Sequence, residues 1–106
     1  RAFATARAAS LGRRGYGEGR VKAALRSAGI DDEDGADAAE LARRQAWQAA
    51  LRFAERRRIG PFANEIADRP AREKRLAAML RAGHPLDLAR QLVEARPGEI
   101  PEPDGF

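Results

Sequence analysis

A short amphipathic helix with its own stop signal constrains the fold of this chain more than any other segment. Val21, Ala24 and Leu25 follow helical spacing and share one face, while basic residues surround the other. Gly29 follows the last periodic residue, where a helix end needs a left-handed backbone that glycine adopts without a Cβ penalty. Ile30 can then fold back onto the last turn. The segment predicts a short helix closed by a tight turn.

A weaker copy of this segment lies further along the chain. Leu76 takes the place of Val21 at an offset of 55 residues, and Gly83 closes the copy one residue early relative to Gly29. Such a period is typical of helical repeat arrays. Similar sequences also arise by chance in a chain rich in alanine and arginine, so the pattern alone leaves both explanations open.

Helical periodicity recurs along the rest of the chain, whereas β-branched residues are few and never alternate. In the first helix, the expected apolar stripe includes Phe3, Ala6, Ser10 and Leu11. The predicted helices cover residues 2–14, 18–28, 32–41, 42–58, 71–82 and about 86–95. We therefore expect an all-α protein whose short helices pack closely.

Capping residues and helix breakers predict where these helices end. Asp31 or Asp32 is expected to cap the third helix, which Gly35 weakens. No breaker separates residues 41 and 42, so the third and fourth helices are either separate or one bent helix. The run Ile59-Gly60-Pro61 is expected to end the fourth helix, and Pro70 suits the start of the fifth after a loop over residues 62–68.

Few aromatic side chains are available for the core. Trp47 is expected to be buried, but its spacing to Phe53 does not place both on one core line. Phe62 is expected to cover the end of the core. Tyr16 lies in a turn between basic residues and could contact a partner. His84 lies in a predicted turn, and we interpret it as a capping or packing residue rather than a base.

The charge of the chain is distributed in blocks. Lys and Arg number 20 against 16 Asp and Glu, which gives a formal net charge of +4. Residues 1–30, 41–58 and 69–82 are basic, and residues 31–40 are acidic. This pattern favours separate charged faces and an anionic partner; a merely solvated surface is the alternative. The candidate binding residues are Arg13, Arg14, Tyr16, Arg20, Lys22, Arg26, Arg56, Arg57, Arg58, Arg72 and Arg75.

The sequence lacks the residues that enzyme chemistry needs. It has no cysteine, one histidine, and only Ser10 and Ser27, both within predicted helices. Gly15, Gly17 and Gly19 alternate, but no strand precedes them and no Gly-Lys-Ser/Thr follows, so they are not a phosphate-binding loop. The acidic cluster lacks calcium-loop spacing and suits a helix N-terminus instead; its members are Asp31, Asp32, Glu33, Asp34 and Asp37. We expect no catalytic activity, metal or cofactor.

The sequence also carries no sign of a membrane protein. No apolar run approaches the roughly 20 residues that span a bilayer, and no signal peptide is visible. The chain begins at Arg1 rather than at methionine, so we expect a fragment of a longer chain. The expected location is cytoplasmic.

The order of motifs resembles the RecX family, bacterial regulators of the RecA recombinase. Segments that resemble the family span about residues 1–95: Phe3-Ala4, Gly15-Tyr16-Gly17, Arg20-Val21-Lys22, Leu25, Gly29-Ile30, Trp47 through Gly60, Arg72-Glu73-Lys74, Met79-Leu80 and Gly83. Two positions depart from the family pattern. His84 replaces the usual aromatic residue after the third-repeat glycine, and Ala82 replaces the usual basic residue before it.

This resemblance implies tandem three-helix repeats that form an elongated, curved, right-handed-helix array. Residues 1–14 would be the last helix of a first repeat, 15–60 the second repeat, 61–95 the third, and 96–106 a disordered acidic tail. The implied function is non-catalytic. Members of the family bind RecA filaments on DNA and inhibit their ATPase, recombinase and coprotease activities in DNA repair and the SOS response.

The partners implied are the RecA filament first and single-stranded or duplex DNA second, with no membrane, for a monomeric protein. One alternative is a helix-turn-helix module that binds duplex DNA directly. Another is a helical scaffold whose charge serves only solubility.

Overall fold

The computed structural model describes residues 2–30 and 35–102, and within these ranges it is all-helical, as expected. Its elements are α1 (Ala2–Arg13), α2 (Glu18–Ser27), α3 (Ala36–Arg44), α4 (Ala46–Arg57), the 3-10 turn η1 (Gly60–Phe62), α5 (Arg69–Arg81) and α6 (Leu86–Glu94). The molecule is elongated, with extents of 43 × 24 × 20 Å. Among the helices of the described ranges, none has the length and apolar character needed to cross a membrane.

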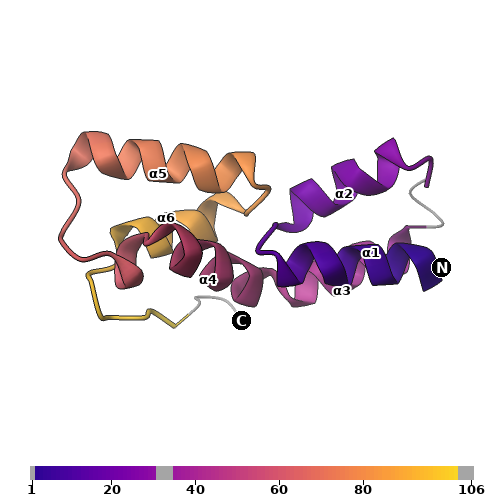
Figure 1. The fold of residues 1–106 in the computed structure, drawn as a ribbon, viewed down its shortest axis with the longest axis horizontal. Helices are drawn as coiled ribbons and strands as arrows, with labels where there is room; N and C mark the ends of the chain where they lie inside the picture. Colours follow the sequence, from indigo (N-terminus) through magenta and orange to yellow (C-terminus); the bar gives the residue numbers. More distant parts are fainter. Residues whose placement is uncertain (1, 31–34, 103–106) are drawn as a thin grey trace.

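The helices form two groups, each around its own core (Figure 1). Helices α1–α3 bury a first core of small and medium residues: Ala4, Ala8, Leu11, Val21, Leu25 and Ala38. Helices α4–α6 bury a larger core that includes Trp47, Phe53, Ile59, Met79, Leu88 and Leu92. Tyr16 packs against both cores. These packing groups divide the chain between α3 and α4, whereas the repeat boundaries expected at residues 15 and 61 stay a prediction.

The buried face of α1 differs from the expected stripe. Ala4, Ala8 and Leu11 point into the first core, and Phe3 is 64% exposed. Both stripes fit a period of 3.6 residues, so periodicity could not choose between them. Helix α1 packs along α3, and the two alanines allow the close approach that a phenylalanine in the interface would prevent.

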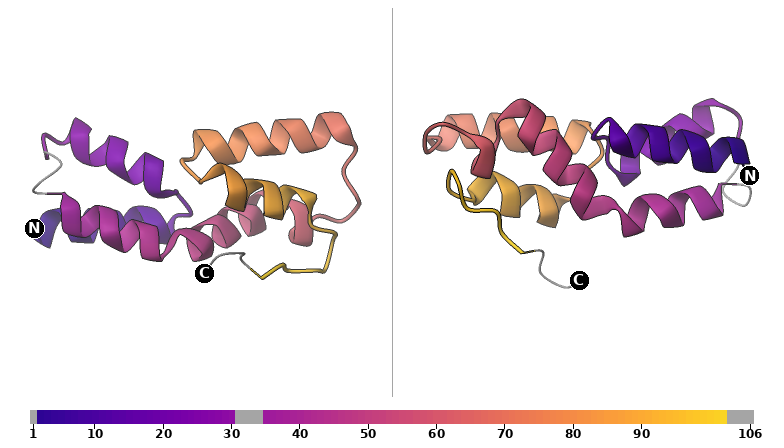
Figure 2. Two further views of the ribbon diagram at one scale, coloured as in Figure 1. Left: turned by 180° about the vertical axis from the view of Figure 1, so that it is seen from behind. Right: turned by 60° about the horizontal axis from the view of Figure 1, so that its bottom comes forward.

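Helices α3 and α4 are separate but joined by a single residue. Gln45 ends one helix and begins the next, with φ −100° and ψ 10°. Its N–H donates to the carbonyl of Leu41 at 3.1 Å, and its own carbonyl accepts from Ala49 at 2.9 Å. The chain bends at this point (Figure 2), so that α3 joins the first core and α4 the second.

Helix α3 begins later than expected. Its first residue is Ala36, and Gly35 is its N-cap rather than an interior residue. The expected caps Asp31 and Asp32 lie outside the described residues.

Both Trp47 and Phe53 are buried in the second core, and the burial of Trp47 was expected. Helix α4 packs against α1, α5, α6 and η1 and is therefore covered over much of its circumference. Its remaining inward positions are alanines, namely Ala46, Ala49, Ala50 and Ala54. These small residues leave room for two large aromatic side chains that point in different directions.

Four helices end in the same hydrogen-bonded turn. In α1, α2 and α5 the left-handed residue is Gly15, Gly29 or Gly83, with φ of 89°, 81° and 94°. The residue after each glycine donates its N–H back to the helix, as Tyr16 does to Leu11, Ile30 to Leu25 and His84 to Met79. When α2 and α5 are aligned on these turns, Met79 takes the place of Leu25. The second copy is therefore not closed one residue early, as the sequence comparison had indicated.

Helix α4 ends in this turn with an arginine in place of glycine. Arg58 has φ 55°, and Ile59 donates its N–H to the carbonyl of Ala54 at 2.8 Å. The helix thus ends before the run Ile59-Gly60-Pro61, as expected, and Gly60 itself serves a close approach. A Cβ on Gly60 would lie 1.8 Å from the carbonyl oxygen of Leu92 in α6.

Helix α5 begins at Arg69, two residues before the expected start. Asp68 is its N-cap, and the carboxylate accepts a hydrogen bond from the N–H of Ala71 at 3.0 Å. Pro70 lies in the first turn, where its missing N–H costs nothing.

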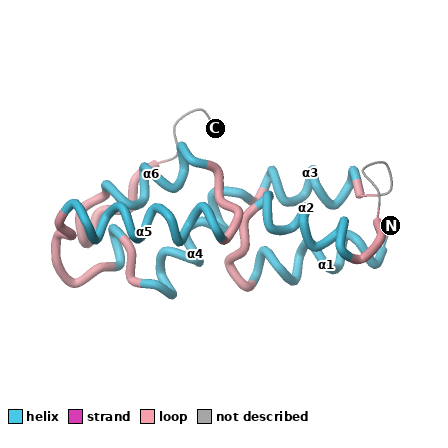
Figure 3. The backbone as a smooth tube through the Cα atoms, turned by 90° about the horizontal axis from the view of Figure 1, so that it is seen from above, coloured by secondary structure: helices cyan, strands magenta, loops and turns pink. Residues whose placement is uncertain are grey.

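Two glycine-containing turns join the two groups of helices (Figure 3). Gly17 donates its N–H to the carbonyl of Ala82 at 2.9 Å, and Gly19 donates to Gly83 at 3.0 Å. A Cβ on Gly83 would lie 2.2 Å from the backbone nitrogen of Arg20. The turn after α1 and the turn after α5 therefore touch through their backbones, which fixes the basic residues of α2 relative to the second core.

Candidate partner-binding surface

Tyr16 holds two arginines beside its ring. The guanidinium carbons of Arg14 and Arg20 lie 5.3 and 4.9 Å from the ring centroid. Tyr16 itself is fixed, because its N–H donates to the carbonyl of Leu11 at 3.0 Å. Guanidinium groups that stack on an aromatic face keep their edge N–H groups available for carboxylate or phosphate. We call Arg14, Tyr16 and Arg20 the Tyr16 cluster.

Arg56 links the Tyr16 cluster to α4. Its guanidinium donates to the carbonyls of Arg13, at 3.0 Å, and Arg14. Arg52, one turn earlier, donates to the carbonyl of Gly12 at 3.1 Å. The carbonyls of Gly12 and Arg13 lie in the last turn of α1 and that of Arg14 follows directly after it, at the end where carbonyls have no partner within the helix. Some of the N–H groups of Arg56 are thus occupied in joining the end of α1 to α4, and fewer remain for a partner.

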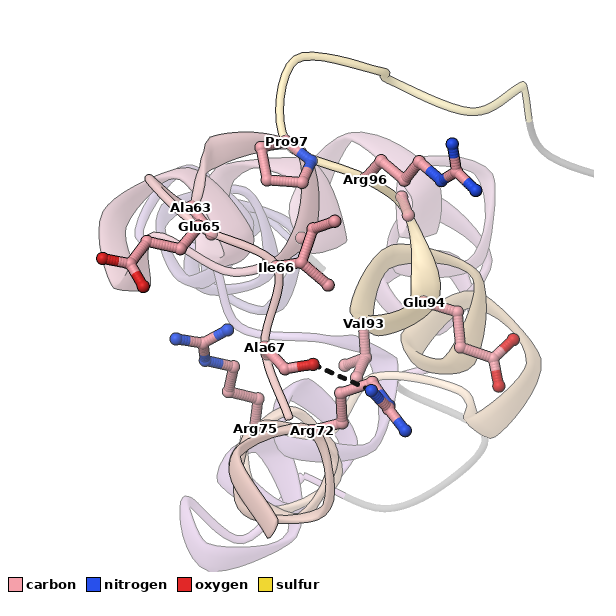
Figure 4. A pocket seen from close by; sticks show the side chains of 12 residues that line it. Ala63, Glu65, Ile66, Ala67, Arg72, Arg75, Val93, Glu94, Arg96 and Pro97 are labelled. Atoms are coloured by element: carbon pink, nitrogen blue, oxygen red, sulfur yellow. Dashed lines mark hydrogen bonds between the residues drawn. The ribbon is translucent and has the colours of Figure 1, made fainter. Parts of the chain in front are cut away.

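Predicted arginines from the end of α4 and from α5 lie together beside the loop of residues 63–68. Arg57 lies with its guanidinium 5.1 Å from the ring centroid of Phe53. Together with Arg58 and Arg75 it lines a hollow of about 430 Å³. Arg72 donates to the carbonyl of Ala67 at 2.8 Å and lines a neighbouring hollow of about 400 Å³ (Figure 4).

The remaining predicted residues lie on α2. Lys22 pairs with Glu18 at 3.4 Å, so its charge is partly neutralised. Glu18 also lies 3.6 Å from Arg43 of α3. Arg26 is exposed in the last turn of the helix.

Sequence analysis missed two arginines that hold the structure together, Arg43 and Arg52. Arg52 lies one helical turn before Arg56, and this spacing was the available signal. Arg43 pairs with Glu18 across helices, a contact with no local signature.

His84 is buried at the junction between the two groups of helices. Its ring lies 5.2 Å from that of Phe53, and it is 3% exposed. Burial lowers the pKa of His84 from its usual 6.5 to about 4, and the nearby backbone of Gly15 offsets this only in part. Within the described ranges, neither ring nitrogen has a partner with good hydrogen-bond geometry. The neutral imidazole therefore acts as a packing group.

No cluster of His, Cys, Asp and Glu that could hold a metal ion occurs in the part of the chain that the structure describes. No protein-family model matches the chain, and no curated protein or solved structure matches it either. The similarity to the RecX family accordingly stays a prediction, and function has to be argued from the residues and their arrangement.

Proposed function

We propose that this protein is a non-catalytic regulator of the RecX type. In this proposal it binds RecA filaments on DNA and inhibits their ATPase, recombinase and coprotease activities during DNA repair. The proposal includes a tandem three-helix array, a monomer and a cytoplasmic location. Its basis is the order and spacing of motifs over residues 1–95.

The Tyr16 cluster is the single observation that supports a binding function most directly. Its two guanidinium groups come from different segments, Arg14 from the turn after α1 and Arg20 from α2, and converge on one ring that contacts both cores. Cations fixed in this way lose less side-chain entropy on binding than free arginines do. They suit acidic groups on a partner surface or the phosphates of DNA.

The proposed mechanism is occlusion. An elongated body of 43 Å carries basic residues at its central junction and beside the loop of residues 63–68. Contacts at both places would bridge neighbouring parts of a filament and oppose the rearrangements that ATP turnover and strand exchange require.

Fluorescence anisotropy with a labelled 36-nucleotide single strand, naked or coated with RecA, tests the proposal. The regulator should bind the coated strand at least tenfold more tightly than naked single-stranded or duplex DNA. Preference for naked duplex, with an affinity that falls with salt at a slope of about 0.9 per phosphate contact, would contradict the proposal and favour the helix-turn-helix alternative.

A further inference from the structure

Arg58 occupies a backbone position where the three equivalent helix ends carry glycine. Its φ is 55°, against 89°, 81° and 94° at Gly15, Gly29 and Gly83. A side chain in the left-handed region is unfavourable because its Cβ crowds the following carbonyl. Strain of this kind is typical of positions where the side chain itself has a task. Arg58 is exposed, so packing does not explain its presence.

The side chain of Arg58 lines the 430 Å³ hollow together with Arg57 and Arg75. Among the described residues, the side chains of Arg58 and Arg75 have no ion-pair or hydrogen-bond partner. Five arginines and three carboxylates line this hollow and its neighbour. One of the carboxylates, Asp68, is already engaged as the N-cap of α5. The lining therefore carries an excess of uncompensated positive charge.

Ile66 lies between the two hollows and lines both of them. Its side chain is 74% exposed, the highest value among the large hydrophobic residues described as exposed. The loop around it is anchored, because Arg72 holds the carbonyl of Ala67 and Asp68 caps α5. In Figure 4, Arg72 and Arg75 lie on one side of Ile66 and Arg96 on the other. An anchored apolar residue is thus presented to solvent between cationic groups.

We propose that Arg57, Arg58, Ile66 and Arg75, here named the Ile66 surface, dock an acidic protein segment that carries an apolar side chain. The inference rests on the proposed function, because the segment would belong to the protein component of the filament. Arginine is enriched in the hot spots of protein–protein interfaces, and the exposed Ile66 between the arginines adds apolar surface that a protein partner can bury. A phosphate backbone would match the arginines but would leave Ile66 without a contact, so the composition favours a protein partner over DNA.

The substitution Arg58→Gly gives the sharpest test, because it should raise the stability of the protein and weaken its binding to the filament. The variant should unfold at a temperature about 4 °C higher, since glycine adopts the left-handed conformation freely. The same variant should bind RecA-coated single strands at least fivefold more weakly than the parent protein. Arg75→Gln and Ile66→Ser should weaken binding to a similar extent. Arg44→Gln, an exposed arginine of α3 outside both hollows, is the matched control and should bind as the parent does.

The binding measurements have four informative outcomes, and each supports or overturns the proposal. Loss of filament binding in all three variants, with naked-strand binding unchanged, supports it. Normal filament binding by all three overturns the Ile66 surface and leaves the proposed function standing. Weakened binding to naked strands by the two arginine variants, with Ile66→Ser unaffected, overturns it in favour of a phosphate site. Failure of the parent protein to bind filaments overturns both the proposed function and this inference.

Discussion

Gly17 donates its backbone N–H to the carbonyl of Ala82 across 2.9 Å, and this bond joins two turns that lie more than sixty residues apart in sequence. A Cβ on Gly17 would lie 2.5 Å from the carbonyl carbon of Gly83. The contact leaves no space for a side chain. It also fixes the start of α2, and with it Arg20 of the Tyr16 cluster, against the second core.

The substitution Gly17→Ala should therefore lower the free energy of unfolding by about 3 kcal/mol, because the new methyl group collides with backbone that cannot move aside. Gly29→Ala is the matched control. Gly29 has φ 81°, but a Cβ there meets nothing within 4 Å. Its loss should be about 1 kcal/mol. Urea unfolding of both variants measures the difference, and equal losses would show that the junction is not closely packed.

Replacement of Arg58 by glycine should raise the free energy of unfolding by about 1 kcal/mol, since the left-handed conformation then carries no Cβ penalty. Arg58→Ala keeps the penalty and removes the side chain. The alanine variant should be close to the parent in stability, so the pair separates backbone strain from side-chain contacts. A gain of similar size in both variants would contradict the strain argument.

The stability of the protein should fall as the pH drops below 6.5. Burial lowers the pKa of His84 to about 4 in the folded state, whereas the unfolded chain has the usual 6.5. Between these values the unfolded state binds more protons, so stability is full above pH 6.5 and is lost as the pH falls toward 4. From pH 7.5 to pH 5 this loss should be about 2 kcal/mol.

The variant His84→Phe isolates this effect, because phenylalanine fills the aromatic position beside Phe53 and does not titrate. Urea unfolding of the variant should change much less between pH 7.5 and pH 5 than that of the parent. An equal pH dependence in both proteins would place the titrating group elsewhere.

Loss of the Arg56 guanidinium should loosen the contact between α1 and α4. Arg56 donates to the carbonyls of Arg13 and Arg14 at the C-terminal end of α1, and a single ammonium group reproduces this fork poorly. We expect Arg56→Lys to cost about 1 kcal/mol of unfolding free energy. Arg44→Lys, at an exposed position of α3, is the control and should be neutral. Equal destabilisation by both changes would point to a general effect of replacing arginine by lysine, rather than to the contact between Arg56 and α1.

Local signals in the sequence predicted the helices, and the glycine that ends α2 behaves as its position indicated. The spacing of Val21 and Leu25 also predicted the buried face of α2, because both residues lie in the first core. Such features depend on a few neighbouring residues. They are visible without knowledge of the partner that covers the helix.

Prediction from the sequence was wrong, or left alternatives open, where packing between distant segments decides the structure. Phe3 and Ala4 both fit a helical stripe, and only the approach of α3 selects Ala4. The bend at Gln45 has no breaker residue that would mark it in the sequence. It follows from the packing of α3 in the first core and of α4 in the second. The contact between Gly17 and Ala82 is made by backbone atoms, which have no signature beyond the glycines themselves.

The sequence predicted which residues belong to the candidate site, but not how they are arranged in space. Basic runs in the sequence identified Arg14 and Arg20, but not their convergence on Tyr16. The meeting of Arg58 with Arg75 depends on the turn after α4 and the start of α5. Ile66 was not singled out, because an isolated isoleucine in a loop has no sequence pattern.

The DNA-dependent ATPase rate of RecA on single-stranded DNA shows whether this protein regulates RecA. It should be measured with the parent protein, with the double variant Arg14→Gln/Arg20→Gln and with Arg44→Gln, each substoichiometric to RecA. A regulator of RecA should cause a clear drop in rate as the parent protein and as Arg44→Gln, and a much smaller drop as the double variant. An unchanged rate with the parent protein, while it still binds naked duplex DNA, would contradict a regulator of RecA.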